Sequence, residues 1–407
     1  MLDFQKLKKA VVYAAGSSQF YRGRLRGFDP RELRGLDDFT RLPFSDKYDL
    51  RHAYPLGLLA APPEEIVRVH SSSGTTGQAV IIPYTRQDVE DWATMFARCF
   101  ALAGVTRADR VQITPGYGLW TAGIGFQAGC EKLGAMAVPT GPGNTEKQLQ
   151  LMLDLQSTVI CATASYALLL AEEVQKRGLA DKINLKRGVI GSERWGELMR
   201  RRIAEQLRIE LFDIYGLTEI YGPGIAIDCP SHAGMHYWDD FIYCEVIDPA
   251  TGRVLPEGET GEIVVTTLRK EGAPLLRYRT HDISRLIPGQ CPCGRSYPRL
   301  DRIVGRTDDM IKVKGVNIYP GQIEDILRQT PGLSSEYYIE IDYDENGKER
   351  LSMRAESAAA DRAAVSRAVE RTFRAKIGLR VRCECVGLGE LPRSEKKTRR
   401  VFDKRAE

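Results

Sequence analysis

Strand and helix patterns alternate over roughly 150 residues of the N-terminal half of the chain. Helical periodicity in 88–104 precedes an apolar strand pattern at 111–116, and a second strand pattern at 157–163 leads into a helix that ends at Gly178. Strands that are joined by helices run parallel, and helices cover both faces of such a sheet. The sequence therefore predicts an α/β fold with a mostly parallel, helix-covered sheet.

Two other patterns follow. From about residue 225 to 305, short strands separated by Gly- and Pro-containing turns predict a β-rich, antiparallel subdomain. From Asp309 onward, strands and two amphipathic helices predict a compact α+β unit. We expect an N-terminal domain of residues 1–307 and a small mobile lid of residues 308–407.

Composition limits the function. The 407 residues carry 58 basic and 54 acidic side chains, a net charge of +4. So small an excess favours neither a nucleic acid nor a membrane as partner. The sequence has no apolar run of 18 residues and no signal peptide, which predicts a cytoplasmic protein without a membrane span.

The first motif that could carry chemistry is a loop of serine, threonine and glycine at 71–77, between two strand patterns. Small hydroxyl residues and glycines let backbone N–H groups close around phosphate oxygens. The spacing is not that of a nucleoside-triphosphate loop that ends in lysine, so a flexible turn is the alternative.

A second motif runs from Asp213 to Glu219. Here the pattern predicts a strand that ends at Tyr215, a turn at Gly216, and Thr218 and Glu219 at the start of the next segment. An aromatic ring can stack on a purine, a hydroxyl can reach a phosphate and a carboxylate can hold Mg²⁺. A capped helix start is the alternative.

Three more motifs follow in order. They are Arg-Tyr-Arg-Thr-His-Asp at 277–282, Gly-Arg-Thr-Asp-Asp-Met-Ile-Lys-Val-Lys-Gly at 305–315 and Leu-Pro-Arg-Ser-Glu-Lys-Lys at 391–397. The acid of the first could accept hydrogen bonds from ribose hydroxyls. Taken alone, the last reads as a solvated charge run.

In this order the five motifs resemble the adenylate-forming superfamily of acyl-CoA synthetases, luciferases and adenylation domains, and most closely the phenylacetate–CoA ligase family. Further matching segments, such as LPFSDKYDLRHAYPLGLLAAP, extend the resemblance over almost the whole chain. The resemblance implies that ATP activates a carboxylic acid as an acyl-adenylate with release of pyrophosphate, and that the CoA thiol then displaces AMP.

The resemblance assigns the nucleotide site. Tyr215 would stack on adenine, Thr218 would touch the α-phosphate, Glu219 would hold Mg²⁺, and Asp282 would bind the ribose with Arg306 alongside. The β- and γ-phosphates would lie on the loop, held by Ser72, Ser73, Gly74, Thr75, Thr76 and Gly77. The cofactor site would also include Asp213, Gly216, Gly191, Ser192 and Glu193.

The resemblance also implies roles in the C-terminal part. Lys397 would bridge the carboxylate and the α-phosphate, where a cation offsets the repulsion of two anions in the transition state. Asp308 would be the hinge on which the lid turns, and Gly315 would lie beside the CoA channel. Gln78 replaces a lysine of the family loop, from which we expect weaker ATP binding, and Lys396 replaces a glycine.

The acid pocket is expected to involve Tyr117, Gly118, Trp120 and Ile124, together with residues 191–193. Bulky aromatics among glycines suit a flat ring that lies on backbone. Core packing explains these aromatics as well. With no lysine or arginine in place to read a second charge, we expect a small aromatic mono-acid such as phenylacetate.

Cysteine spacing predicts a metal site. Cys291 and Cys293 form a Cys-Pro-Cys-Gly turn, and Cys229 lies close to His232 and His236 in the sequence. Three thiolates and one imidazole make a closed structural zinc site. The resemblance favours His236 as the fourth ligand, and free cysteines without metal are the alternative.

The leading hypothesis is an aryl-acid–CoA ligase that depends on ATP and Mg²⁺. Two rivals stay open. One is an enzyme that adenylates but uses an acceptor other than CoA, and the other is a catalytically silent nucleotide-binding relative. The resemblance also suggests a homodimer.

Overall fold

The computed structural model describes residues 4–72, 79–119, 121–193, 195–308, 311–314, 316–318, 320–345, 347–393 and 400–405. These residues form two compact units. Unit 1 comprises residues 1–162, 183–192 and 210–303, and unit 2 comprises residues 163–182, 193–209 and 304–407. The domain boundary expected between residues 307 and 308 stays a prediction.

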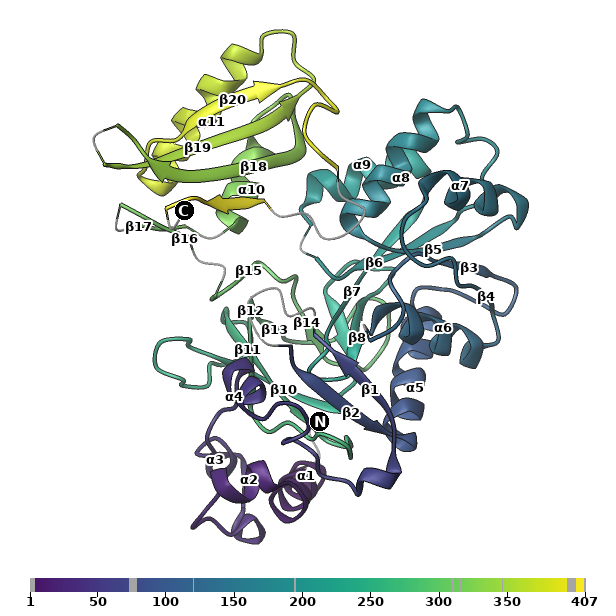
Figure 1. Ribbon diagram of the computed structural model, residues 1–407, viewed down its shortest axis with the longest axis vertical. Coiled ribbons are helices and arrows are strands. Elements are labelled where there is room, and N and C mark those ends of the chain that lie inside the picture. Colours follow the sequence, from purple (N-terminus) through teal and green to yellow (C-terminus); the bar gives the residue numbers. More distant parts are fainter. Residues whose placement is uncertain are drawn as a thin grey trace. The chain divides into compact units, whose positions relative to one another are not determined.

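The centre of unit 1 is a nine-stranded sheet in the order β13-β14-β9-β8-β7-β6-β5-β3-β4 (Figure 1). Strand β3 pairs in parallel with β4 and β5, and β6 pairs in parallel with β7. From β7 onward the pairing is antiparallel. The strands are β3 (Arg110–Ile113), β4 (Met136–Val138), β5 (Val159–Thr163), β6 (Arg187–Gly191), β7 (Glu210–Leu217), β8 (Gly222–Asp228), β9 (Met235–Tyr237), β13 (Leu286–Ile287) and β14 (Arg299–Leu300).

Helices pack on this sheet. Helix α5 (Arg86–Leu102) lies against β8, and α6 (Ala122–Leu133) lies against α5, β3 and β8. A capping box of Thr85 and Asp88 starts α5. Its aromatic stripe of Trp92, Phe96 and Phe100 is fully buried, so the stripe packs in the core. Helix α7 (Thr145–Asp154) contacts β3 through Gln148, which accepts a hydrogen bond from Gln112 at 2.7 Å.

A smaller antiparallel sheet of unit 1 contains β10 (Ile242–Ile247), β11 (Gly261–Thr267) and β12 (Tyr278–Ser284). The β-rich stretch predicted at 225–305 thus divides between this sheet and the antiparallel edge of the large one. A hairpin of β1 (Ile66–Ser71) and β2 (Ile81–Thr85) flanks the Ser/Gly/Thr loop, as the sequence predicted.

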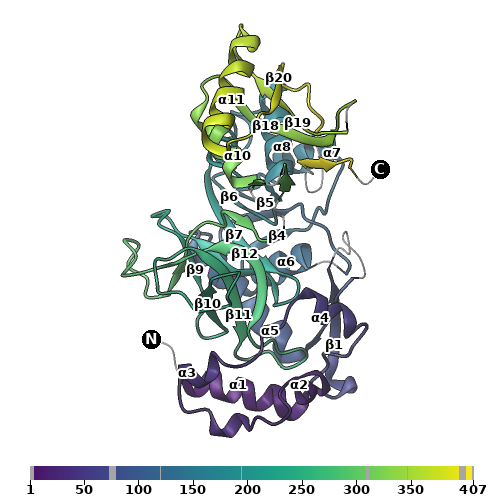
Figure 2. The ribbon, with the colours of Figure 1, turned by 90° about the vertical axis from the view of Figure 1, so that its left-hand side faces the viewer.

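The N-terminal helices of unit 1 lie together in Figures 1 and 2. Leu7, Val11, Tyr21 and Phe39 form one apolar cluster among them, which also includes Leu268. These elements are α1 (Phe4–Ser17), α2 (Gln19–Arg24), η1 (Pro30–Glu32), α3 (Leu36–Phe39), α4 (Lys47–His52) and η2 (Pro63–Glu65).

Unit 2 has its own core around a four-stranded sheet in the order β20-β19-β18-β21. Helices α10 and α11 contribute Ile323, Leu327, Val369 and Phe373 to this core. Its elements are α8 (Ala164–Lys176), α9 (Glu197–Leu207), β15 (Gly305–Arg306), β16 (Ile311–Val313), β17 (Val316–Ile318), α10 (Pro320–Gln329), β18 (Leu333–Tyr343), β19 (Glu349–Ser357), α11 (Arg362–Ile377), β20 (Arg382–Val386) and β21 (Val401–Asp403).

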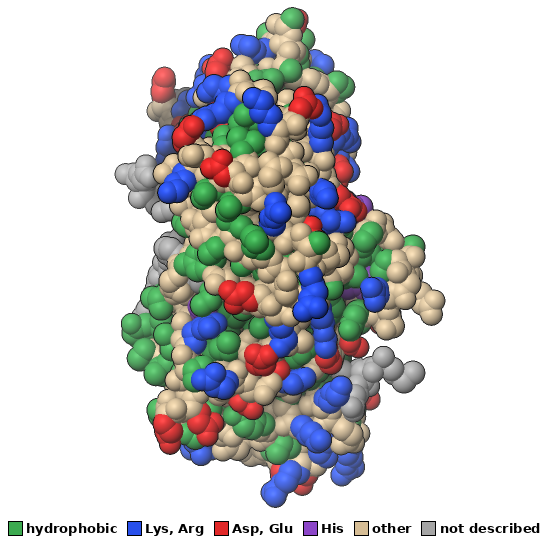
Figure 3. All heavy atoms as spheres, turned by 90° about the vertical axis from the view of Figure 1, so that its right-hand side faces the viewer, with side chains coloured by type: hydrophobic (Ala, Val, Ile, Leu, Met, Phe, Trp, Pro, Cys, Tyr) green, Lys and Arg blue, Asp and Glu red, His purple; other side chains and the backbone are tan. Residues whose placement is uncertain are grey.

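The expected α/β fold with an α+β C-terminal part is confirmed. Among the described residues, no helix is both long and apolar enough to cross a membrane. On the face drawn in Figure 3, acidic and basic side chains are interspersed.

Candidate functional site: a nucleotide site and a metal cluster

Strand β7, which contains most of the second motif, is longer than the sequence predicted. The strand continues to Leu217 instead of ending at Tyr215, with an irregular register between Tyr215 and Gly216. Gly216 allows this pairing because a Cβ at its position would come within 2.0 Å of the Gly222 carbonyl oxygen. After a turn the chain forms the antiparallel strand β8, so the alternative of a helix start is wrong.

Tyr215 and Asp282 meet in unit 1, although they come from strands of different sheets. The Tyr215 hydroxyl donates a hydrogen bond of 2.7 Å to Asp282 Oδ2. Burial, followed by the charge of Asp282, raises the pKa of Tyr215 well above its usual value. The hydroxyl therefore stays protonated as a donor and fixes a carboxylate that is only 5% exposed.

Glu219 is buried and forms an ion pair with Lys47 at 3.1 Å. Lys47 begins α4, in the segment that the resemblance covers, but the sequence reasoning assigned it no role. A lysine in an N-terminal helix start gives no local signal that it will lie beside a carboxylate 172 positions later in the chain, counted from 47 to 219. Thr218 lies next to this pair in the sequence, and its hydroxyl is 3.4 Å from the hydroxyl of Thr121.

The base of the Ser/Gly/Thr loop is closed by hydrogen bonds. Ser72 N–H donates to the Val80 carbonyl, and Val80 N–H donates to the Ser72 hydroxyl, each at 3.0 Å. Ser71 N–H donates to the Leu119 carbonyl at 2.8 Å. The other predicted phosphate ligands, Ser73, Gly74, Thr75, Thr76 and Gly77, lie outside the described residues, as do Trp120, Gly315 and Lys397.

Gly191 and its neighbours are divided between the units. A Cβ on Gly191 would come within 2.3 Å of the Ile214 carbonyl oxygen, so glycine lets β6 and β7 pair closely. Ser192 has a left-handed backbone (φ 69°). In unit 2, Glu193 accepts hydrogen bonds from Ser165 N–H at 2.5 Å and from the Ser165 hydroxyl at 2.9 Å, which caps the start of α8.

In unit 2, the expected ribose partner Arg306 pairs with the expected hinge residue Asp308. Arg306 Nε and Nη2 each lie 2.8 Å from one carboxylate oxygen of Asp308. A bidentate pair of this kind has well-defined geometry.

Asp213, another expected member of the cofactor site, lies in unit 1 on β7, opposite Ile190 of β6.

The predicted acid-pocket residues Tyr117 and Ile124 are half-buried beside the main core. A Cβ on Gly123 would come within 2.8 Å of the Tyr117 ring, and a Cβ on Gly141 would come within 3.9 Å of it. The ring thus lies close to glycines, whereas Gly118 is exposed with φ 91°. The Tyr117 hydroxyl is buried and has no hydrogen-bond partner among the described residues.

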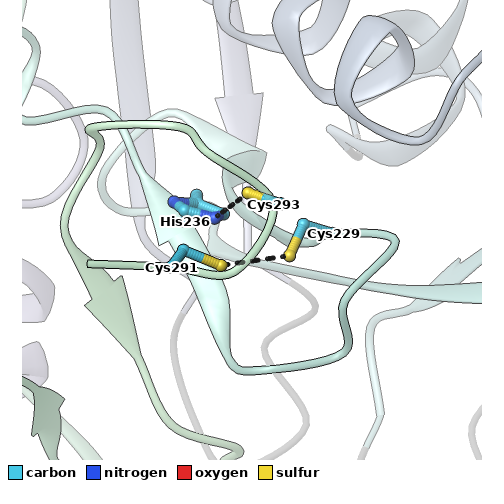
Figure 4. Close-up of side chains that lie close together, drawn as sticks. All are labelled: Cys229, His236, Cys291 and Cys293. Carbon is cyan, nitrogen blue, oxygen red and sulfur yellow. Dashed lines mark hydrogen bonds between the residues drawn. The ribbon is translucent and has the colours of Figure 1, made fainter. Parts of the chain in front are cut away.

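The four predicted metal ligands converge at the antiparallel edge of the large sheet (Figure 4). The ligand atoms of Cys229, His236, Cys291 and Cys293 all lie within 4.8 Å of one another. Cys229 Sγ is 3.6 Å from Cys291 Sγ, and Cys293 Sγ is 3.2 Å from His236 Nε2. Two thiolates on one tetrahedral zinc ion stand about 3.8 Å apart, so the donor set fits zinc.

Neighbouring bonds decide which histidine belongs to the cluster. His236 Nδ1 is 2.8 Å from the Tyr297 carbonyl, to which it can donate, and this leaves Nε2 to face the thiols. Burial lowers the pKa of His236, which favours the neutral ring that a metal needs. His232 instead lies 2.7 Å from Asp228 and is not in the cluster.

Comparisons with known proteins show the family of this chain. Residues 59–268 match the family model of the AMP-binding enzymes, and residues 315–405 match the AMP-binding enzyme C-terminal domain. A phenylacetate-coenzyme A ligase of Pseudomonas putida is 40% identical, with 99% of this chain and 93% of that protein covered. The chain belongs to the phenylacetate–CoA ligase family. The family predicted from the sequence, and with it the class of AMP-forming acid–CoA ligases, is confirmed.

Other members of the family and its structural relatives extend this result. A phenylacetate-coenzyme A ligase of Escherichia coli strain K12 is 38% identical over 99% of this chain and 94% of its own length. Among solved structures, a 2-hydroxyisobutyryl-CoA ligase in the postadenylation state, in complex with R3-HIB-AMP, has a TM-score of 0.89. It is 30% identical, with 99% of this chain and 89% of that chain covered.

Proposed function

We propose that this chain converts a small aromatic carboxylic acid, ATP and CoA into the aryl-acyl-CoA, AMP and pyrophosphate, through an acyl-adenylate. The contact between Tyr215 and Asp282 carries the proposal. It joins the residue expected on adenine to the residue expected on ribose, and it does so near the end of β7 that leads to Thr218 and Glu219.

In this reaction the chain's own groups bind and orient the reactants. The Tyr215 ring would stack on adenine while its hydroxyl holds the Asp282 carboxylate ready to accept ribose hydroxyls. Thr218 would donate to the α-phosphate. Mg²⁺ bound at Glu219 would neutralise phosphate charge, and Lys397 would draw the carboxylate and the α-phosphate together.

An aromatic acid is supported by the surroundings of Tyr117 and Ile124. A half-buried aromatic ring against glycines offers a flat apolar wall. The curated relatives that cover most of the chain are named phenylacetate-coenzyme A ligases, whereas the structural relative is named for 2-hydroxyisobutyrate, a small aliphatic acid. A test of substrates must therefore include both kinds of acid.

The test measures pyrophosphate release with ATP and Mg²⁺ for a panel of aryl and aliphatic acids, each with and without CoA. Release that depends on an aryl acid and is accelerated by CoA, with the acyl-CoA seen by mass, supports the proposal. Release that is indifferent to CoA supports the adenylation-only rival. If ATP binds and no acid gives release, the chain behaves as the silent relative.

We also propose that Cys229, His236, Cys291 and Cys293 bind one structural zinc ion. Three thiolates and an imidazole leave no ligand position for water, so such an ion would join the loop after β8 to the loop between β13 and β14 and take no part in the reaction. Metal analysis of the purified protein tests this.

Homodimerisation and a cytoplasmic location stay predictions, and light scattering tests the first.

A further inference from the structure

The two side chains of the ion pair between Lys47 and Glu219 differ in their exposure to solvent. The Glu219 side chain is 5% exposed, whereas the Lys47 side chain is 34% exposed. The carboxylate is fixed inside unit 1, and the ammonium group reaches it from the surface on a flexible four-carbon stem. Lys47 can therefore move away from the pair more readily than Glu219.

The backbone of Lys47 is firmly anchored. Asp46 and Asp49 form a capping box at the start of α4, with two hydrogen bonds of 3.0 Å. Asp49 is further held by Arg24 Nη1 at 2.8 Å. Only the Lys47 side chain is thus left to change position.

The same segment is tied to the strand of the expected ribose ligand. Ser45 N–H donates to the Arg277 carbonyl at 3.2 Å, and Arg279 N–H donates to the Ser45 carbonyl at 2.8 Å. Arg279 lies on β12, three positions before Asp282. The backbone that leads into Lys47 is therefore held by the same strand that carries Asp282.

Magnesium binding at Glu219 would disrupt this pair. A carboxylate holds Mg²⁺ at about 2.0–2.1 Å, and a second cation on the same carboxylate is repelled. The displaced ammonium would then need another anion, and the ATP phosphates that bind the same metal would supply one. The loop that would hold these phosphates, residues 71–78, contains no lysine or arginine in its sequence.

We propose that Lys47 changes partner during the reaction. In the free enzyme it pairs with Glu219, and with ATP bound it contacts a β- or γ-phosphate oxygen, where it supplies the cation that the loop lacks. The inference rests on the proposed function, because it takes Glu219 as the magnesium ligand.

The test compares the binding of ATP and of AMP, each with Mg²⁺, by calorimetry. The variant is Lys47→Gln, which removes the charge but keeps a hydrogen-bond donor for Glu219. Lys132→Gln is the matched control, because Lys132 is 35% exposed and pairs with Glu90, which is not part of the nucleotide site. Lys47→Arg keeps the charge.

We expect Lys47→Gln to weaken ATP binding by about 10- to 100-fold, the usual effect of losing a charged hydrogen bond. AMP binding should stay within about threefold of wild type, since AMP has no β- or γ-phosphate. Lys47→Arg should retain most of the affinity for ATP.

Equal ATP affinities of Lys47→Gln and Lys132→Gln would overturn the inference. Equal losses for ATP and AMP would also overturn it, because Lys47 would then only support the fold around Glu219. If wild type binds ATP but no acid gives pyrophosphate release, the proposed ligase function fails, and the ATP-to-AMP comparison still decides the role of Lys47.

Discussion

Single side chains of unit 1 gain their function from partners far away in the sequence. The Tyr215 hydroxyl, on one sheet, lies 2.7 Å from Asp282 Oδ2 on another, and Lys47 reaches Glu219 from an N-terminal helix. In each pair a buried carboxylate contacts a donor group from a distant part of the chain. Removal of the donor and removal of the acid should therefore have different effects.

For the nucleotide site, Asp282→Asn should raise the KM for ATP by about 10- to 100-fold, since it removes a charged acceptor of ribose hydrogen bonds. Tyr215→Phe keeps the ring and removes only the hydroxyl that positions Asp282, so the KM should rise by about threefold. Steady-state kinetics with saturating acid and CoA measure both. A larger effect for Tyr215→Phe would contradict these roles.

Lys270 is a buried lysine of unit 1. Its ammonium lies 3.7 Å from the ring centre of Tyr84 and 4.2 Å from that of Tyr221, and it has no hydrogen-bond partner among the described residues. Burial lowers the pKa of Lys270 to about 7. The folded state therefore favours the neutral amine, while the unfolded chain keeps the amine protonated up to about pH 10.4.

This difference gives a pH dependence. Between about pH 7 and 9.5 the unfolded state binds more protons than the folded state, so the free energy of unfolding should rise with pH by up to about 1.4 kcal/mol per unit. Below pH 7 the contribution should be flat. In Lys270→Met the rise should be absent, as measured by urea unfolding at each pH, whereas Lys132→Met should behave as wild type. Parallel curves for wild type and Lys270→Met would refute the assignment.

At the scale of elements, the antiparallel edge of the large sheet depends on loops more than on strands. Strand β13 and strand β14 have two residues each, and the loop between them carries Cys291 and Cys293. So short a pair has few ladder hydrogen bonds. A metal cross-link to Cys229 and His236 would supply the missing constraint.

Accordingly, Cys291→Ser should abolish bound zinc and lower the melting temperature by about 5 °C or more, since each 1 kcal/mol corresponds to roughly 2–4 °C in a domain of 150–250 residues. Adenylation at low temperature should stay within about threefold of wild type, because a closed site takes no part in the chemistry. Cys244→Ser is the matched control, as Cys244 is buried but outside the cluster. Full zinc content in Cys291→Ser would contradict the site.

At the scale of the whole molecule, the two half-reactions are expected to need different positions of the C-terminal part, with Asp308 as the hinge. Asp308, the expected hinge residue, forms a bidentate pair with Arg306. A change at position 308 can therefore act through the backbone or through this pair. Two substitutions separate the possibilities.

We expect Asp308→Pro to retain acid-dependent pyrophosphate release within about threefold and to lower acyl-CoA formation by about 10-fold or more, because proline fixes φ at the hinge. Asp308→Ala removes the pair with Arg306 but leaves the backbone free, so both half-reactions should continue. Single-turnover assays of each half-reaction measure this. Equal losses in both half-reactions of Asp308→Pro would argue against a hinge.

The sequence by itself determined the family, the alternation of strands and helices, and the three cysteines of the candidate metal site. These follow from local patterns: periodicity sets each element, and motifs such as 213–219 or Cys291-Pro-Cys293 keep their meaning without the rest of the chain. The stripe of Trp92, Phe96 and Phe100 was likewise readable as core. Local pattern failed at Tyr215, where pairing with β8 extends the strand to Leu217.

Only the tertiary structure decided the pairings. The residues alone left His236 and His232 open, although the family resemblance favoured His236. The register of β9 with β14 decides for His236, because it sets this residue opposite Arg299, in the strand that follows the Cys291–Cys293 loop. Lys47 and Lys270 are ordinary lysines in the sequence, and their roles arise from burial and from the neighbours that the fold brings to them. Contacts between distant segments depend on the packing of the whole unit, which no window of sequence contains.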